Sequence, residues 1–253
     1  MAIKTAVIDG VATIEIARPE KKNALTGAMY LALAQALDAA REDDAVRAVL
    51  IAGQPGIFTS GNDIEDFVKR PANLQEAPSF AFMKALMGCD KPVIAAVTGA
   101  AIGIGTTMLL HCDFVYVSDE ARLALPFVTL GLVPEFASSL IVPQLMGNVR
   151  AAEKLLLGDP FSAAEAVECG IANAVLPAGE VVKHARRVAE RFNALPPGAV
   201  RATKRLLRRH RAETLLETIA AEGEVFGARL QSPEAKEAFS AFFDKRKPDF
   251  SRF

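Results

Sequence analysis

The chain has 253 residues, of which 51% are apolar and 23% charged, and its formal net charge is −1. This composition is typical of a globular protein with a sizeable core. The balanced charge gives no general reason to expect a nucleic-acid or membrane partner. The N-terminus has no basic segment followed by an apolar run, so we expect no signal peptide. Three cysteines without metal-like spacing indicate free thiols in a reducing compartment.

The predicted elements alternate between strands and helices along most of the chain. Residues 5–17 predict two strands joined at Asp9-Gly10. A helix is predicted over 23–44, with Thr26 as its N-cap. We expect buried strands at 46–53, 92–99 and 114–119, a loop rich in turn formers at 54–63, and a helix at 105–113. Later segments predict a helix ending at Gly158, a helix capped by Ser162, and a strand at 172–177.

This alternation predicts an α/β fold with mostly parallel strand pairing. The pattern changes after the "LPPG" segment at 195–198, because from there on it is almost entirely helical. We therefore expect a core over residues 1–195 and a C-terminal helical region over 196–253. The basic run at 201–211 has no aromatic residues and is followed by acidic ones, which favours a solvated or inter-subunit helix face over a nucleic-acid site.

Two loops are candidates for presenting backbone N–H groups to a ligand. The first is "SGND", Ser60 to Asp63, which could equally be a surface turn. The second is "TGAAIGIGTT" at 98–107, a turn between a buried strand and a helix. Met108 stands where a dinucleotide motif needs its third glycine, so that interpretation is set aside. An anion or oxyanion site and close helix–strand packing remain open for this turn.

Glu135 is the only charged side chain between Arg122 and Arg150. A buried charge without a partner is costly, so this carboxylate must be solvated, paired with a distant residue, or used in chemistry. Because Pro134-Glu135 suits the first turn of a helix, a solvated glutamate at a helix start is the simplest interpretation. The chain has no G-x-S-x-G motif, and no spacing supports a nucleophile paired with His111.

Together these segments resemble the crotonase family, also called the enoyl-CoA hydratase/isomerase superfamily. The resemblance rests on the order of "GIFTSGNDIEDF", "KPVIAAVTGAAIGIG", "CDFVYVSDEARLALPFVTLGLVPE" and "GDPFSAAEAVECGIANAVLP". It implies a crotonase-like ββα spiral fold with a C-terminal helical trimerisation region. It also implies an acyl-CoA substrate whose thioester oxygen is held by the backbone N–H groups of Asn62 and Ile104. Such donors stabilise an enolate-like transition state, by ~3–4 kcal/mol each.

The resemblance also bears on the reaction. The hydratases of this family use two glutamates, and the matching positions here are Thr107 and Phe127, which cannot act as bases. Glu135 instead matches the glutamate of the peroxisomal-type Δ3,Δ2-enoyl-CoA isomerases, which need one base. Desolvation should raise the pKa of this carboxyl group and strengthen it as a base. Other crotonase-type activities remain alternatives, namely hydration, dehalogenation or thioester hydrolysis, as does a non-catalytic acyl-CoA-binding protein.

The remaining expectations also follow from the resemblance. We expect no metal and no cofactor other than the coenzyme A of the substrate. We expect a homotrimer or hexamer in which the C-terminal region serves oligomerisation and site closure. The C-terminal "SRF" is not the peroxisomal S-K-L signal, so a cytoplasmic location is expected. The candidate substrate-binding residues are Ser60, Gly61, Asp63, Ile64, Gly103, Phe127, Lys22 and Lys245.

Overall fold

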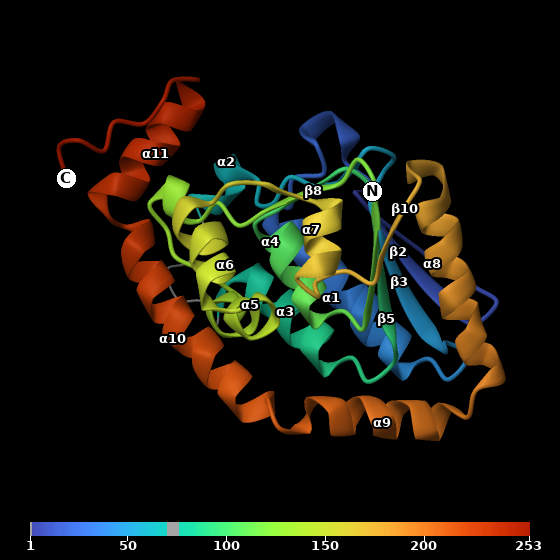
Figure 1. Cartoon of the computed structure of the whole chain (residues 1–253). Coiled ribbons are helices and arrows are strands. Elements are labelled where there is room, and N and C mark those ends of the chain that lie inside the picture. Colours follow the sequence, from blue (N-terminus) through green and yellow to red (C-terminus); the bar gives the residue numbers. More distant parts are fainter. Residues whose placement is uncertain (1, 70–75) are drawn as a thin grey trace.

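A computed structural model describes residues 2–69 and 76–253, and Figure 1 shows the arrangement of its elements. The main sheet has six strands in the order β1-β2-β3-β5-β7-β10. These strands are β1 (Ile3–Ile8), β2 (Val11–Ile16), β3 (Ala48–Ala52), β5 (Val93–Val97), β7 (Phe114–Ser118) and β10 (Ala174–Leu176). Only β1 and β2 are antiparallel, and they turn at Asp9 and Gly10, whose φ angles of 49° and 71° suit a tight hairpin. The predicted hairpin and the mostly parallel pairing are confirmed.

Both faces of the main sheet are covered by helices, which is why its central strands are continuously apolar. Leu50 and Ile94 face α8 (Val181–Glu190), while Val49 and Ile51 belong to the core on the opposite face. On that opposite face lie α1 (Gly27–Glu42) and α3 (Pro78–Gly88). The Thr26 side chain accepts a hydrogen bond from Met29 N at 3.3 Å, so the predicted N-cap of α1 is confirmed.

A second sheet contains four short strands in the order β4-β6-β8-β9. They are β4 (Ile57–Thr59), β6 (Ala100–Ile102), β8 (Arg122–Ala124) and β9 (Phe161–Ser162). The prediction that 54–63 is wholly loop was therefore wrong, because β4 lies within it. Two- and three-residue strands are too short to show an alternating pattern, and their pairing partners lie far away in sequence.

The remaining helices of the core are short. They are α2 (Ile64–Phe67), α4 (Ile104–Thr107), α5 (Ser138–Met146), α6 (Asn148–Ala152) and α7 (Ala163–Glu168). A 3₁₀ turn, Met108–His111, extends α4, and a π-helical turn, Glu153–Leu157, extends α6 up to Gly158. Ser162 and Glu165 form a capping box on α7, which confirms the predicted cap. Other 3₁₀ turns are Pro19–Lys21, Val128–Leu130, Ala178–Glu180 and Arg191–Ala194.

Three helices complete the chain and wrap around the outside of the core (Figure 1). They are α9 (Pro197–Arg209), α10 (Ala212–Leu230) and α11 (Pro233–Phe243). The Lys204 ammonium lies 2.6 Å from one Asp113 carboxylate oxygen, and the Arg208 guanidinium lies 3.0 Å from the other. The basic run is therefore not simply a solvated or inter-subunit face, because one side of α9 is anchored to the core. None of the described helices has the length and apolar character needed to cross a membrane.

Candidate active site

The two predicted donor loops lie side by side because β4 and β6 are parallel neighbours. Ile57 pairs with Ala100 and Thr59 with Ala101, so the loops that follow leave the same edge of the sheet. A Cβ atom on Gly61 would lie 2.8 Å from the Ile102 carbonyl oxygen. This contact shows that the loop after β4 packs against the end of β6, with no room for a side chain at position 61.

The backbone of Asn62 is oriented by pairing with Leu25. The Leu25 N–H donates to Gly61 O at 2.8 Å, and the Asp63 N–H donates to Leu25 O at 2.9 Å. In such a parallel bridge the N–H of the middle residue points to the opposite side. The Tyr30 hydroxyl also donates to Asn62 Oδ1 at 2.6 Å, which holds the side chain. The Asn62 N–H is thereby directed away from Leu25.

Ile104 begins α4, and the turn before it is closed by Gly103. Gly103 has a φ of 56° and ψ of −117°, and its N–H donates to Ala124 O at 2.9 Å. The Thr106 and Thr107 N–H groups donate to the Gly103 carbonyl. The first N–H of a helix has no acceptor within the helix. Within residues 2–69 and 76–253, neither the Asn62 N–H nor the Ile104 N–H donates a hydrogen bond, as an oxyanion site requires.

Glu135 is buried, with only 6% of its surface exposed. It precedes α5 by three positions, and Phe136 and Ala137 between them adopt left-handed backbone conformations with φ of 58° and 57°. The interpretation of Glu135 as a solvated helix-start residue was therefore wrong. The Glu135 carbonyl accepts hydrogen bonds from the Ser138 N–H and hydroxyl at 3.1 and 2.7 Å.

The turn after Glu135 is held by two residues that sequence reasoning did not connect with it. His111 Nε2 donates to Phe136 O at 2.8 Å, and the two rings stack at 3.8 Å. Burial lowers the pKa of His111 to about 4, so its ring is neutral near pH 7. Glu222 of α10 accepts hydrogen bonds from the Ala137 and Ser139 N–H groups at 2.6 and 2.9 Å. Burial raises the pKa of Glu222, although these hydrogen bonds partly oppose it.

An apolar cluster lies beside the donor loops. It includes Phe127, which is 5% exposed, together with Phe67 of α2. Phe67 makes edge-to-face contacts with Phe226 of α10 and Phe239 of α11, with ring centroids 6.0 and 6.1 Å apart. The last two helices therefore pack over the segment that follows Asn62. Ile64 also packs against this cluster.

The candidate coenzyme contacts are only partly brought together. Lys22 is exposed, and its carbonyl accepts a hydrogen bond from Ser60 N at 3.1 Å, so it lies beside the loop. The Asp63 carboxylate instead pairs with Arg18 at 2.6 Å and caps α2. Burial raises the pKa of Asp63, but the bond to Arg18 and the backbone N–H groups outweigh this and lower it. Lys245 is exposed beyond α11, and no hydrogen bond or ion pair among the described residues joins it to the loop.

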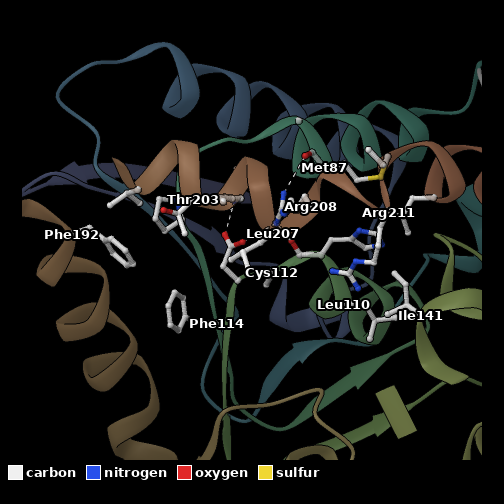
Figure 2. A pocket seen from close by; sticks show the side chains of 18 of the residues that line it. Met87, Leu110, Cys112, Phe114, Ile141, Phe192, Thr203, Leu207, Arg208 and Arg211 are labelled. Atoms are coloured by element: carbon white, nitrogen blue, oxygen red, sulfur yellow. Dashed lines mark hydrogen bonds and ion pairs between the residues drawn. The ribbon is translucent and has the colours of Figure 1, made fainter. Parts of the chain in front are cut away.

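Two cavities lie in very different places. One of about 210 Å³ is lined by Asn62, Tyr30 and Phe67, next to the donor loops. The other, about 950 Å³, lies between α9, the start of α10 and the core, and Figure 2 shows side chains that surround it. None of the predicted site residues lines the second cavity. Although it is the larger of the two, this cavity is therefore not assigned as the active site. His111 is one of the residues that line it.

Comparison with known proteins identifies the family. The family model described as Enoyl-CoA hydratase/isomerase matches residues 7–252. The chain belongs to the enoyl-CoA hydratase/isomerase family. This confirms the resemblance and the crotonase-like fold, and proteins of this family are enzymes that act on acyl-CoA thioesters.

Relatives of this family with different names are similarly close. The chain is 35% identical to human enoyl-CoA delta isomerase 2 over 94% of its own length and 62% of the relative, so it spans less than two thirds of that protein. It is 31% identical to a probable enoyl-CoA hydratase of Bacillus subtilis, covering 98% of both chains. The solved structure of Pseudomonas aeruginosa OdaA is 52% identical, with a TM-score of 0.93, over 95% of this chain and 98% of that one.

Proposed function

We propose that the protein is a Δ3,Δ2-enoyl-CoA isomerase in which Glu135 is the single catalytic base. The observation that carries this proposal is the buried position of Glu135, with Thr107 and Phe127 at the two places where the family's hydratases have glutamates. A threonine hydroxyl and a phenyl ring cannot accept a proton from water near neutral pH. The similarity to enoyl-CoA delta isomerases adds support.

The proposed reaction moves a double bond within the acyl group. The Glu135 carboxylate removes a proton from C2 of a 3-enoyl-CoA, and the C3=C4 electrons delocalise into a dienolate. The Asn62 and Ile104 N–H groups hold the thioester oxygen as its negative charge develops. The Glu135 carboxyl group then returns the proton to C4, giving the trans-2-enoyl-CoA. One base is sufficient because the same proton leaves and returns.

Apolar surroundings suit this reaction in two ways. Burial destabilises a carboxylate relative to its protonated form, so it makes the carboxylate a stronger base. A dry pocket also reduces addition of water to the conjugated product. Phe127 and Ile64 belong to the apolar cluster beside the donor loops and are assigned to the acyl pocket.

The coenzyme and assembly assignments belong to the same proposal. Ser60, Gly61 and Gly103 shape the donor loops, and exposed Lys22 lies where a coenzyme A phosphate could reach it. Lys245 is assigned a second phosphate contact on charge alone. We propose a homotrimer or hexamer, which is supported by Leu206, Leu207 and Leu216, exposed by 63, 74 and 55% on α9 and α10. Light scattering of the purified protein measures this directly, and a monomer would contradict it.

A substrate comparison tests the proposed reaction. Purified protein is given a 3-enoyl-CoA series of increasing chain length, and conjugation is followed by ultraviolet absorbance. Crotonyl-CoA is tested in parallel, with loss of conjugation reporting water addition. We expect double-bond migration to exceed water addition by at least about 100-fold in kcat/KM, the ratio that a missing general acid–base group typically gives. Faster hydration than isomerisation would show that the hydratase alternative is correct.

A further inference from the structure

We infer that Glu222 of α10 is a positioning residue that sets the orientation of the Glu135 carboxylate. This inference rests on the proposed function, because it concerns the residue to which the proton-transfer step is assigned. It goes beyond that function by giving the C-terminal helical region a direct part in the geometry of the reacting group.

The backbone between Glu135 and α5 needs an external support. Phe136 and Ala137 both have φ near 58°, a region that residues with a Cβ atom seldom adopt, and two such residues in succession are rarer still. Such a conformation persists only when the surrounding structure imposes it. The turn leads directly from Glu135 into α5, so a change in these two residues would rotate the segment that carries the carboxylate.

Glu222 supplies that support through three hydrogen bonds. One carboxylate oxygen accepts from Ala137 N at 2.6 Å, and the other accepts from Ser139 N at 2.9 Å and the Ser139 hydroxyl at 2.5 Å. Two of these donors are backbone N–H groups at the start of α5, where a helix has no acceptors of its own. The bonds therefore fix the main chain on both sides of Ser138.

Glu222 binds the turn through hydrogen bonds and not through an ion pair. The side chain of Glu222 is buried, with 8% of its surface exposed. Among the described residues it forms no salt bridge with a lysine or arginine, so its charge is balanced by the three donors. Because both carboxylate oxygens accept hydrogen bonds, Glu222 constrains the orientation of the turn as well as its distance from α10.

His111 holds the same turn from the core side. Its Nε2 donates to Phe136 O, and its ring stacks on the Phe136 ring with an interplanar angle of 16°. His111 and Glu222 thus bind the two ends of one peptide group, the Phe136 C=O and the Ala137 N–H. His111 comes from the turn that extends α4, whose first residue is the proposed oxyanion donor Ile104. The base and the donor loop are in this way connected through the Phe136–Ala137 turn.

The test compares Glu222→Gln with wild type in the 3-enoyl-CoA assay. The glutamine keeps one acceptor oxygen and presents an NH₂ group to a backbone N–H, so part of the support is lost. We expect kcat to fall about 10- to 100-fold while KM changes by less than about threefold, because a misplaced base affects the transition state more than substrate binding. With substrate deuterated at C2, the isotope effect on kcat should be as large as in wild type or larger, since proton removal becomes more rate-limiting.

Two further variants keep the test interpretable. Glu224→Gln changes an exposed glutamate on the same helix and should leave kcat and KM unchanged. Glu222→Asp keeps the charge but shortens the side chain, and should give a kcat between those of wild type and Glu222→Gln. It replaces Glu222→Gln if that variant does not fold, as judged by circular dichroism.

The outcomes separate the inference from the proposed function. A folded Glu222→Gln with kcat and KM both within threefold of an active wild type would overturn the inference alone. A raised KM with unchanged kcat would also overturn it, because Glu222 would then act on binding. A wild type that does not isomerise any 3-enoyl-CoA would overturn the proposed function, and the inference with it.

Discussion

His111 and Glu222 are buried ionisable residues that bind the same turn, and burial shifts their pKa values in opposite directions. Burial disfavours the charged form of each, so it lowers the pKa of the histidine and raises that of the glutamate. Neither role was visible in the sequence. His111 stands 25 positions before Phe136, and Glu222 stands 85 positions after Ala137. These residues come together only in the folded chain, and no local sequence pattern predicts such a contact.

At the residue scale, we predict that His111 makes stability depend on pH. Its pKa is about 4 in the folded protein and near 6.5 when unfolded, so the unfolded chain binds more protons between these values. The stabilisation that comes from His111 is therefore complete above about pH 6.5. As the pH falls toward 4, the free energy of unfolding decreases by about 3 kcal/mol in total. Urea unfolding followed by circular dichroism measures this directly.

His111→Gln is the matched control, because a glutamine amide can donate to Phe136 O and does not titrate. Other groups titrate equally in both proteins. We expect the variant to lose less stability than wild type between pH 7 and 4.5. Equal losses in the two proteins would show that His111 is not the group responsible.

At the element scale, the site depends on strands that the sequence pattern could not reveal. The helices α1 and α7 were predictable because their caps, Thr26 and Ser162, are local signals. β4 and β6 have three residues each and pair across more than 40 positions, so neither propensity nor alternation identifies them. The sequence suggested two donor loops, and the family resemblance joined them into one site. The structure supplies the physical reason, which is parallel pairing of the strands before them.

A steric prediction tests this pairing. A Cβ atom on Gly105 would lie 2.6 Å from Thr59 Cγ2, so Gly105→Ala should push the helix start and the Ile104 N–H away from the loop after β4. We expect kcat to fall at least about 10-fold, since small displacements of a positioned group reduce rates strongly. Thr59→Ser removes the methyl group and keeps the hydroxyl that bonds Asn23 O and Gly61 N.

The double variant Gly105→Ala/Thr59→Ser should therefore recover most of the lost kcat, and Thr59→Ser alone should be close to wild type. The same 3-enoyl-CoA assay measures all three proteins. If the double variant remained as slow as Gly105→Ala, contact between these two loops would not explain the effect.

At the scale of the whole molecule, polar contacts attach two of the C-terminal helices to the core. α9 is held by Lys204 and Arg208 on Asp113, and α10 is held by Glu222 on the turn after Glu135. The change to a helical pattern after residue 195 predicted these helices correctly. The basic run did not reveal which of its side chains face inward, since lysines on both faces of a helix look alike in sequence. The division into units at residues 195 and 196 stays a prediction.

We predict that two consecutive basic residues of α9 differ sharply in their effect on stability. Lys204 is buried and donates to Lys91 O and Asp113 Oδ2, both at 2.6 Å. Lys204→Met should lower the free energy of unfolding by about 1.5–3 kcal/mol, the range for hydrogen bonds that involve a charged group. Arg205 is 65% exposed and lies 3.7 Å from Asp90, so Arg205→Met should cost about 0–1 kcal/mol. Urea unfolding checks both, and equal costs would contradict the anchoring role of Lys204.

The central claim is that Glu135 alone moves the proton. It is tested most directly by the turnover of Glu135→Gln on a 3-enoyl-CoA that wild type isomerises. Glutamine nearly matches the size of glutamate but cannot accept the proton. We expect kcat to fall by about 10²- to 10⁴-fold, with circular dichroism and KM close to those of wild type. A folded Glu135→Gln that isomerises within about threefold of the wild-type rate would show that another group is the base.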